Sequence, residues 1–316
     1  MDQKISELVQ NMIKGDRRSL SRVLSLVEEQ DDQAFEILES VFSHVGQGFS
    51  IGITGPAGAG KSTLIDQLIK AFRQDKHKVS ILAVDPSSPF SGGAVLGDRV
   101  RMQRHFSDEG VFIRSIGSRG KSGGVSFATR ALLQILDASG SERVIVETVG
   151  AGQSEVDVMN LVDTTVVVLT PESGDSIQAL KAGMLEIANV FVINKKDRDG
   201  AERIAHDIEM MLSLVPQVSA WKPPIILTQS QTGEGIPALV EAIEKHRTHI
   251  LQSEEKNDIL LRKRKAFLAE MIQTKVTDKI LHWIESDPER VKRLQESEEP
   301  NLYEIVKEGV SHLIKS

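Results

Sequence analysis

Seven short apolar runs recur along the middle of the chain, and a longer stretch with helical spacing follows most of them. The runs read FSIGIT, VSILAV, VFIRSI, RVIVET, TTVVVL, NVFVIN and PIILT. Most are apolar throughout, as in strands that a parallel sheet buries on both faces. Helical spacing lies between them, at residues 61–74, 125–138, 176–188, 201–214 and 236–249. The pattern predicts an α/β fold, a doubly wound and mostly parallel sheet with its sites at the carboxyl ends of the strands.

The two ends of the chain have helical periodicity and no strand signal. Residues 1–45 predict N-terminal helices, with Leu20, Val23, Leu24 and Val27 on one face. From about residue 254, apolar side chains keep a three-to-four spacing that predicts one long helix ending near residues 287–288 (Asp-Pro). A stripe of that size should pack on its own domain or on a second copy. We therefore expect an N-terminal helical extension (1–45), a central domain (46–250) and a C-terminal helical arm (251–316).

Composition narrows the function classes. The chain has 316 residues, 40% of them hydrophobic and 26% charged, which is ordinary for a globular protein. Its net charge of −7 gives no basic surplus for nucleic acid. It has no cysteine, which excludes disulfides, thiolate metal sites and a cysteine nucleophile. The first residues do not resemble a signal peptide, and no apolar run approaches the ~20 residues that span a bilayer. We expect a cytoplasmic protein with no membrane and no nucleic-acid partner.

The segment ITGPAGAGKST joins the first strand to the first helix of the central domain and matches G-x4-G-K-[ST] from Gly55 to Ser62. Small residues let backbone N–H groups close on a β-phosphate, Lys61 neutralises β- and γ-oxygens, and the Ser62 hydroxyl joins a Mg²⁺ shell. This predicts a P-loop NTPase. A second Gly-Lys-Ser at residues 120–122 lacks the first glycine, because position 115 is serine, and is interpreted as a loop near the site.

The end of the sixth run, FVINKKD, predicts which base is bound. Guanine presents a ring N–H and an amino group side by side, and the carboxylate of Asp197 can accept from both. Asn194 can serve the carbonyl side of the purine, and the stem of Lys195 can lie along its plane. Adenine has an acceptor where guanine has its ring donor, so a site built this way can reject adenine by ~10⁴. The loop LTQSQTGEGI should add backbone N–H groups near Gln229, Ser230 and Gln231.

Carboxylates for Mg²⁺ should come from strand ends that face the phosphate loop. Asp85 ends the second run, Asp98 follows a glycine-rich loop, and Glu147 ends the fourth run. Glu147 is expected to order a metal-bound water while the Gly150 N–H contacts the γ-phosphate. Loss of that phosphate would free the loop, which makes a switch.

The residue directly after the switch glycine is Ala151, where some GTPases place a water-orienting glutamine, and Gln153 comes two residues later. The sequence shows no obvious arginine finger. The candidates are Arg99, Arg101, Arg104 and Arg119. We therefore expect slow intrinsic hydrolysis that a partner accelerates.

Six stretches resemble the methylmalonyl-CoA mutase-associated GTPases, a family formerly described as arginine/ornithine transport system kinases. They read GPAGAGKST, VDPSSPFSGGAVLGDRVRM, VETVGAGQSEVDV, TPESGDSIQALKAGMLEIAN, INKKD and TGEGI. The resemblance implies a homodimer whose GTPase domain carries helical extensions, the C-terminal one serving as dimerisation arm. It also implies that GTP hydrolysis gates the loading of adenosylcobalamin onto an acyl-CoA mutase of the methylmalonyl-CoA mutase type and protects the loaded enzyme.

The resemblance also implies roles for particular residues. Asp85 and Asp98 would be metal-side carboxylates of a first switch, and residues 147–153 would be a second switch. Residues 173–181 would form an extra switch that contacts the mutase, with Lys181 an effector of hydrolysis. Two stretches depart from the family: the base loop has Gln-Ser at residues 229–230 where Ser-Ala is usual, and SRGKSGGVS replaces a more apolar glycine loop.

The candidate residues form three groups. Those for catalysis are Lys61, Glu147 and Lys181, and those for Mg²⁺ are Ser62, Asp85, Asp98 and Glu147. The candidates for GTP or GDP are Gly55, Pro56, Ala57, Gly58, Ala59, Gly60, Lys61, Ser62, Thr63, Gly150, Asn194, Lys195, Asp197, Gln229, Ser230 and Gln231.

Three other functions stay open at this point, one of them a scaffold whose nucleotide is structural, which measurable turnover would dismiss. A nickel- or zinc-insertion GTPase would share the nucleotide domain but would present metal through cysteine and histidine clusters. A kinase of a transport protein, as the older family description suggests, would need a second-substrate pocket. His246 and His249 could form a metal pair, but without further ligands at the right spacing we expect a solvated helix face.

Overall fold

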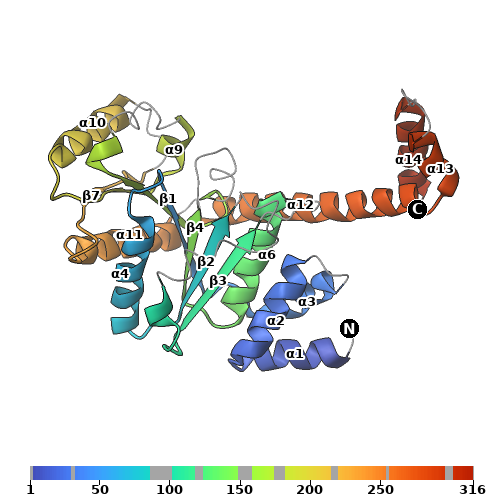
Figure 1. Ribbon diagram of the computed structural model, residues 1–316, viewed down its shortest axis with the longest axis horizontal. Coiled ribbons are helices and arrows are strands. Elements are labelled where there is room, and N and C mark those ends of the chain that lie inside the picture. The colour runs from blue at the N-terminus through green and yellow to red at the C-terminus, as the bar shows by residue number, and fades with distance from the viewer. Residues whose placement is uncertain are drawn as a thin grey trace.

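A seven-stranded sheet lies at the centre of the computed structural model (Figure 1). The structure describes residues 3–29, 33–85, 102–117, 124–148, 159–173, 182–214, 220–253, 256–295 and 302–315. The strands are β1 (Phe49–Thr54), β2 (Val79–Asp85), β3 (Val111–Gly117), β4 (Arg143–Thr148), β5 (Thr164–Leu169), β6 (Val190–Ile193) and β7 (Ile225–Leu227). Their order is β3-β2-β4-β1-β5-β6-β7, and every neighbouring pair is parallel. All seven apolar runs are therefore strands, and the predicted fold class is confirmed.

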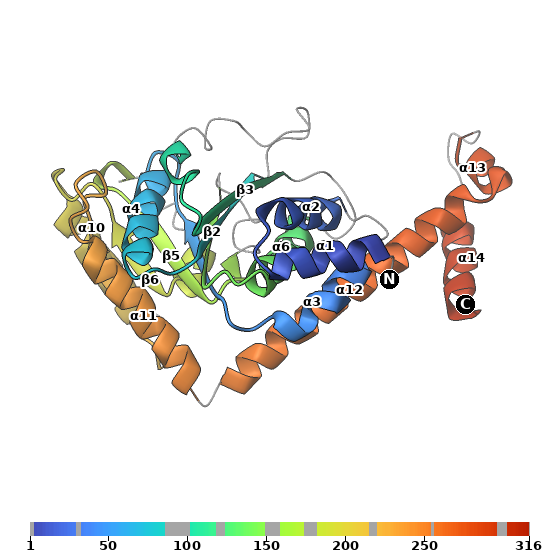
Figure 2. The same cartoon turned by 90° about the horizontal axis from the view of Figure 1, so that it is seen from below.

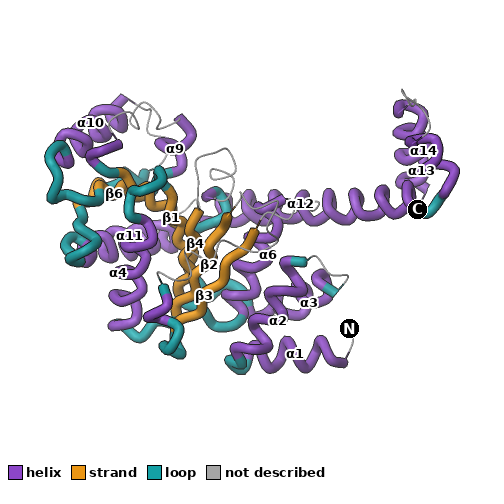
Figure 3. Tube along the Cα trace, in the orientation of Figure 1, coloured by secondary structure: helices purple, strands orange, loops and turns teal. Residues whose placement is uncertain are grey.

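Helices cover both faces of the sheet (Figure 3). On one face, α4 (Lys61–Gln74) and α11 (Ile236–Gln252) share a core with β1, β2 and β5. On the other face, α6 (Gly124–Ala138) packs against β2, β3 and β4, and α9 (Ala182–Ile187) and α10 (Ala201–Leu214) cover β5 and β6. Strand β5 contributes side chains to both cores. Val166 and Val168 lie in the core under α4 and α11, and Val167 and Leu169 lie in the core under α10. Successive side chains of a strand point to opposite faces, so a strand covered twice must be apolar throughout.

The N-terminal helices extend the second of these cores. They are α1 (Gln3–Ile13), α2 (Arg17–Glu28) and α3 (Ala34–Val41), followed by the short turn η1 (Phe42–His44). Val23, Leu24 and Val27 of α2 are buried with α6 and with β2 and β4. Helix α2 begins where the Asp16 side chain accepts a hydrogen bond from the Ser19 N–H at 2.7 Å, a standard N-cap. The division of the chain at residues 45 and 250 stays a prediction.

The C-terminal helices leave the sheet. Helix α12 (Lys256–Glu285) runs away from the sheet, and α13 (Pro288–Gln295) and α14 (Leu302–Lys315) lie at its far end (Figures 1 and 2). Its near part contacts α6, where the Phe267 and Phe127 rings stack with centroids 6.1 Å apart. Beyond that contact large apolar side chains are exposed, namely Leu268, Ile272, Val276 and Leu281 of α12 and Leu302, Tyr303, Val306 and Val310 of α14. No helix in the described part of the chain combines the length and apolarity needed to cross a membrane.

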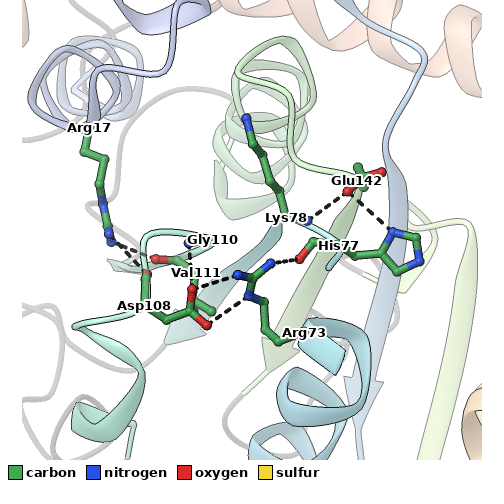
Figure 4. A network of polar contacts seen from close by, with 8 residues as sticks. All are labelled: Arg17, Arg73, His77, Lys78, Asp108, Gly110, Val111 and Glu142. Carbon is green, nitrogen blue, oxygen red and sulfur yellow. Dashed lines mark hydrogen bonds and ion pairs between the residues drawn. The ribbon is translucent and has the colours of Figure 1, made fainter. Parts of the chain in front are cut away.

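A polar network ties the amino ends of β2 and β3 to helices α2 and α4 (Figure 4). Arg73 donates from Nε and Nη2 to the two oxygens of Asp108, at 2.9 and 3.0 Å. The Gly110 N–H also donates to Asp108, and Arg17 of α2 donates to the Val111 carbonyl at 2.7 Å. The hydrogen bonds from Arg73 hold the pKa of Asp108 below its ordinary value of 3.8. This network lies at the edge of the sheet opposite the phosphate loop and is structural.

The acid side of the stability curve tests this network. Because the folded pKa of Asp108 is below its unfolded value, its contribution is present above about pH 3.8 and is lost as the pH falls through the lower folded pKa. We expect Asp108→Asn to lower the free energy of unfolding at pH 7 by about 0.5–1 kcal/mol, since the pair is partly exposed. In urea titrations the gap to the parent chain should close below pH 3.8. Asp278→Asn, at an exposed position of α12, is the control; a gap that persists undiminished in acid would contradict the assignment.

Candidate functional site

The turn between β1 and α4 is built almost from backbone alone. Gly55, Gly58 and Gly60 have φ values of 139°, 77° and 86°, a region that favours glycine. A Cβ at Gly55 would lie 2.0 Å from the Val168 carbonyl oxygen, and one at Gly60 would lie 2.4 Å from Asn194 Nδ2. Side chains are therefore excluded at these two positions by the neighbouring strand ends. The loop fits a phosphate cradle, in which the backbone approaches the ligand closely at the start of a helix.

Lys61 and Ser62 open helix α4 beside this loop. Lys61 is 8% exposed, and its Nζ donates to the carbonyl oxygens of Gly55 at 2.7 Å and Pro56 at 3.1 Å. The ammonium group thus lies over the loop, where it can neutralise phosphate oxygens. The Ser62 hydroxyl donates to Oε1 of Glu147 at 2.8 Å. The structure therefore joins the serine and the strand-end carboxylate that the sequence suggested separately.

Glu147 comes from β4, which lies between β1 and β2 in the sheet. It is 2% exposed and pairs in register with Ile53 of β1, two residues before Gly55. Asp85, the last residue of β2, lies one position beyond the pair formed by Val84 and Thr148. Parallel strands thus bring the end of β4 beside the phosphate loop, with the end of β2 next to it. The Asp85 side chain is outside the described part of the structure, and so are Asp98, Gly150 and Lys181.

The donor set fits Mg²⁺. Ser62 and Glu147 offer only oxygen atoms, the ligands that this ion prefers. The described residues contain no group of three or more His, Asp or Glu side chains that could hold a metal ion. A Mg²⁺ ion usually keeps several waters and binds through one or two protein groups and substrate phosphates. Ser62 and Glu147 are therefore sufficient as the protein side of such a site, and their role in it stays a prediction.

The buried carboxylate Asp66 of α4 binds the short turn at residues 103–105. Asp66, one helical turn after Ser62, contacts His105 Nε2 at 2.7 Å and Lys70 Nζ at 3.0 Å, and it also pairs with Arg104. Arg104 and His105 belong to the short turn η2 (Gln103–His105). Burial alone would raise the pKa of Asp66, but hydrogen bonds from His105, Lys70 and Arg104 outweigh it and lower the pKa. Arg104, a candidate finger, is used here as a structural partner.

Asn194, at the end of β6, connects the phosphate loop to the loop after β7. It is 2% exposed, and its Nδ2 donates to the Ala59 carbonyl at 2.8 Å. Its Oδ1 accepts from the Thr228 hydroxyl at 3.2 Å and from the N–H and hydroxyl of Ser230 at 3.1 and 2.8 Å. The carbonyl is thereby saturated by protein donors. Asn194 is primarily a joint between loops, and one N–H of its amide has no protein acceptor among the described residues.

The loop after β7 offers fewer backbone donors than the sequence suggested. Of its three candidate N–H groups, that of Gln229 donates to the Glu234 carbonyl at 2.9 Å, and that of Ser230 donates to Asn194. The Gln231 N–H has no acceptor among the described residues. Two of these N–H groups thus shape the loop, Gln231 keeps an N–H without an acceptor among the described residues, and the base-contacting role of the loop stays a prediction. The Ser230 side chain helps to hold Asn194, so this departure from Ser-Ala has a structural use.

Asp197 lines a cavity of about 150 Å³ next to this joint. The cavity is also lined by Gly60, Thr63, Asn194, Lys195, Arg198, Gln229, Ser230 and Gln231. The backbone of Lys195 has φ 58°, and the Arg198 N–H donates to its carbonyl at 3.0 Å, which makes a tight turn. The turn presents Asp197 at the surface of the cavity with its carboxylate exposed. Phosphate-loop residues and base-loop residues thus share one hollow, as a nucleotide requires.

Sequence reasoning was wrong about one feature and missed two. His246 does not lie on a solvated face: it is 4% exposed, its Nδ1 lies 2.7 Å from the Thr164 hydroxyl, and Trp221 covers its ring. Thr228 supports Asn194 and could have been found from its position at the end of β7. Glu172, in the turn η3 (Pro171–Ser173), pairs with Lys195 and Arg198, and no sequence signal marks it.

The chain is similar to known proteins over most of its length. A family model described as methylmalonyl Co-A mutase-associated GTPase MeaB matches residues 20–286. A Pyrococcus horikoshii protein named as a GTPase is 46% identical over 275 residues, which cover 86% of each chain. GTPase ArgK of Escherichia coli is 34% identical over 257 residues, 79% of this chain and 78% of its own. The mouse methylmalonic aciduria type A homolog, mitochondrial, is 34% identical over 269 residues, 79% of this chain and 65% of its own.

Among solved structures, the LAO/AO transport system kinase superposes with a TM-score of 0.69 at 24% identity. The match covers 100% of this chain and 99% of that one. At this identity the likeness concerns the fold, which is that of the phosphate loop and parallel sheet described above.

The role of Asp197 in base binding can be tested by replacing one of its hydrogen-bond acceptors with a donor. In Asp197→Asn the amide N–H should repel the 2-amino group of guanine but should donate to the 2-carbonyl of xanthine. We expect calorimetry to show at least a tenfold loss of affinity for GDP and a gain for xanthosine diphosphate, because a mispaired buried polar group costs about 1–3 kcal/mol. Undiminished GDP affinity, or no change in rank between the two nucleotides, would remove Asp197 from the base site.

Proposed function

The chain belongs to the methylmalonyl-CoA mutase-associated GTPase family, and from this premise we propose that its GTP hydrolysis is a switch for a cobalamin enzyme. Members matched along most of the chain are named GTPases, and the chain is a GTPase that binds guanine nucleotide. The switch would gate the loading of adenosylcobalamin onto an acyl-CoA mutase of the methylmalonyl-CoA mutase type and would protect the loaded enzyme.

The observation that carries the proposal is the hydrogen bond between Ser62 and Glu147. It joins the first turn of α4 to the end of β4 at 2.8 Å, at Glu147, the first residue of the segment proposed as the second switch (147–153). A change at the phosphate loop therefore has a short physical route to that segment. Two-state loops that follow the γ-phosphate are the usual device of nucleotide switches.

In the proposed reaction the residues of this chain position the nucleotide and neutralise the charge of its phosphates. Lys61 would bind β- and γ-phosphate oxygens, and Ser62 with Glu147 would hold Mg²⁺, with Asp85 and Asp98 as further metal-side carboxylates. Bound Mg²⁺ would neutralise charge on the phosphates. Glu147 would accept a hydrogen bond from a water, and the Gly150 N–H would contact the γ-phosphate. Lys181, within the switch proposed at residues 173–181, would raise hydrolysis when the mutase is engaged.

The C-terminal arm is proposed to form a homodimer. The exposed apolar residues of α12 and α14 form a surface that a soluble monomer rarely leaves uncovered. A second copy of the chain is the occupant that the family resemblance implies. A metal-insertion GTPase would present its metal through cysteine and histidine side chains. This chain has no cysteine, and its described residues contain no cluster of histidine and carboxylate ligands.

Nucleotide-dependent capture tests the partner. The purified chain, loaded with GDP or with a non-hydrolysable GTP analogue, is used to draw partners from its native cell extract. We expect an adenosylcobalamin-dependent acyl-CoA mutase to be recovered in amounts that differ between the two nucleotides. The mutase should then raise GTP turnover on the order of tenfold or more, since positioned cations speed phosphoryl transfer strongly.

Lys181→Ala is the paired variant in this assay. It should lose the stimulated rate and keep the slow basal rate, because Lys181 is proposed to act only in the complex. Recovery of a hydrogenase or urease precursor in place of a cobalamin enzyme would overturn the proposal. So would equal recovery with both nucleotides.

A further inference from the structure

The turn after β6 places three cations around one carboxylate. Lys195, Lys196 and Arg198 flank Asp197 in the sequence. Among the described residues, none of the ion pairs involves Asp197. Each cation is paired elsewhere: Lys195 with Glu172 at 2.8 Å, Arg198 also with Glu172, and Lys196 with Glu234. Two carboxylates other than Asp197 thus hold all three cations, and the group is neutral only when Asp197 is counted.

A carboxylate in this position would ordinarily attract its neighbours. Two opposite unit charges 4 Å apart attract by about 1 kcal/mol in water and by about 4 kcal/mol near a protein surface. Lys195 and Arg198 line the same cavity as Asp197, so they are the neighbouring cations that share its space. A cation bound to Asp197 would occupy the oxygen lone pairs that guanine needs. Guanine binding therefore requires that these two side chains be held elsewhere.

Glu172 supplies that hold from a different part of the fold. It lies in η3, which follows β5, the neighbour of β6 in the sheet. Its Oε2 forms an ion pair with the ammonium group of Lys195, and its Oε1 forms one with the guanidinium group of Arg198. The partner of Lys196 is a different carboxylate, and Lys196 is not among the residues that line the cavity. Glu172 thus binds the two cations that could compete.

We propose that Glu172 is a specificity-determining positioning residue: it holds Lys195 and Arg198 off Asp197 and so keeps that carboxylate free for the two donors of guanine. The inference rests on the proposed role of Asp197 as the base-binding carboxylate. It assigns Glu172 no contact with the nucleotide. Its effect is on discrimination between bases and should be sensitive to salt, because the competing pairs are partly exposed.

The test compares GDP with inosine diphosphate, which lacks the 2-amino group. Dissociation constants are measured by calorimetry with Mg²⁺ for the parent chain and for Glu172→Gln. We expect the preference for GDP over inosine diphosphate to fall about two- to fivefold, the range set by exposed ion pairs. Raising the salt should recover part of the preference in Glu172→Gln and change it little in the parent. The thermal unfolding midpoint checks that both fold alike.

A double variant separates competition from simple loss of structure. In Glu172→Gln with Arg198→Gln, one of the two released competitors is removed while Lys195 remains, and part of the preference should return. The control is Glu241→Gln, which breaks an exposed pair with Lys245 of the same kind, 2.7 Å long, on α11; its preference should equal that of the parent.

The outcomes distinguish this inference from the base assignment itself. An unchanged preference in Glu172→Gln, or an equal loss in the double variant, overturns the role of Glu172 while Asp197→Asn still abolishes guanine selectivity. If Asp197→Asn keeps guanine selectivity, the base assignment fails, and this inference fails with it.

Discussion

The side-chain amide of Asn194 is the contact on which the nucleotide site depends. It crosses from β6 to the phosphate loop and, on its other side, to the loop after β7, so three strand ends meet at one buried group. The carbonyl oxygen of its side chain accepts three hydrogen bonds, all from protein donors. Removing it would leave the Ala59 carbonyl and the Ser230 N–H without these partners, at about 1–3 kcal/mol for each buried group. The loops that should hold base and phosphate are therefore set by one residue.

The first turn of α4 carries a second joint, between Ser62 and Glu147. The two joints lie on opposite sides of the phosphate loop, one at the end of β6 and one at the end of β4. Glycines at residues 55 and 60 allow this crowding, because a side chain there would strike Val168 or Asn194. A loop clamped on both sides is preorganised, and it passes a change at the phosphates to its neighbours instead of absorbing it. The switch proposed for this GTPase follows from that arrangement.

The sequence predicted the fold well, because a parallel sheet leaves a strong local signal. Runs such as TTVVVL must be strands when both faces are covered, and the glycine-rich segment between a strand and a helix has few other uses. The order of the strands, the partners of Asn194 and the burial of His246 depend on which distant segments meet, and local periodicity carries no such information. Glu172 is the clearest case: it lies 23 residues before Lys195, in a turn with no motif of its own, and only the pairing of β5 with β6 brings them together. The hydrogen bonds that the Gln229 and Ser230 N–H groups make within the protein depend on distant segments in the same way.

The central claim is that Asn194 organises the phosphate half of the site as well as the base half. Calorimetry of Asn194→Ala with Mg²⁺-pyrophosphate, a ligand that has no base, tests it most directly. We expect affinity for pyrophosphate to fall by tenfold or more, in parallel with affinity for GDP, because the phosphate loop loses its anchor. If GDP affinity falls while pyrophosphate binds as tightly as in the parent chain, Asn194 acts on the base alone, and the account of a single buried joint is contradicted.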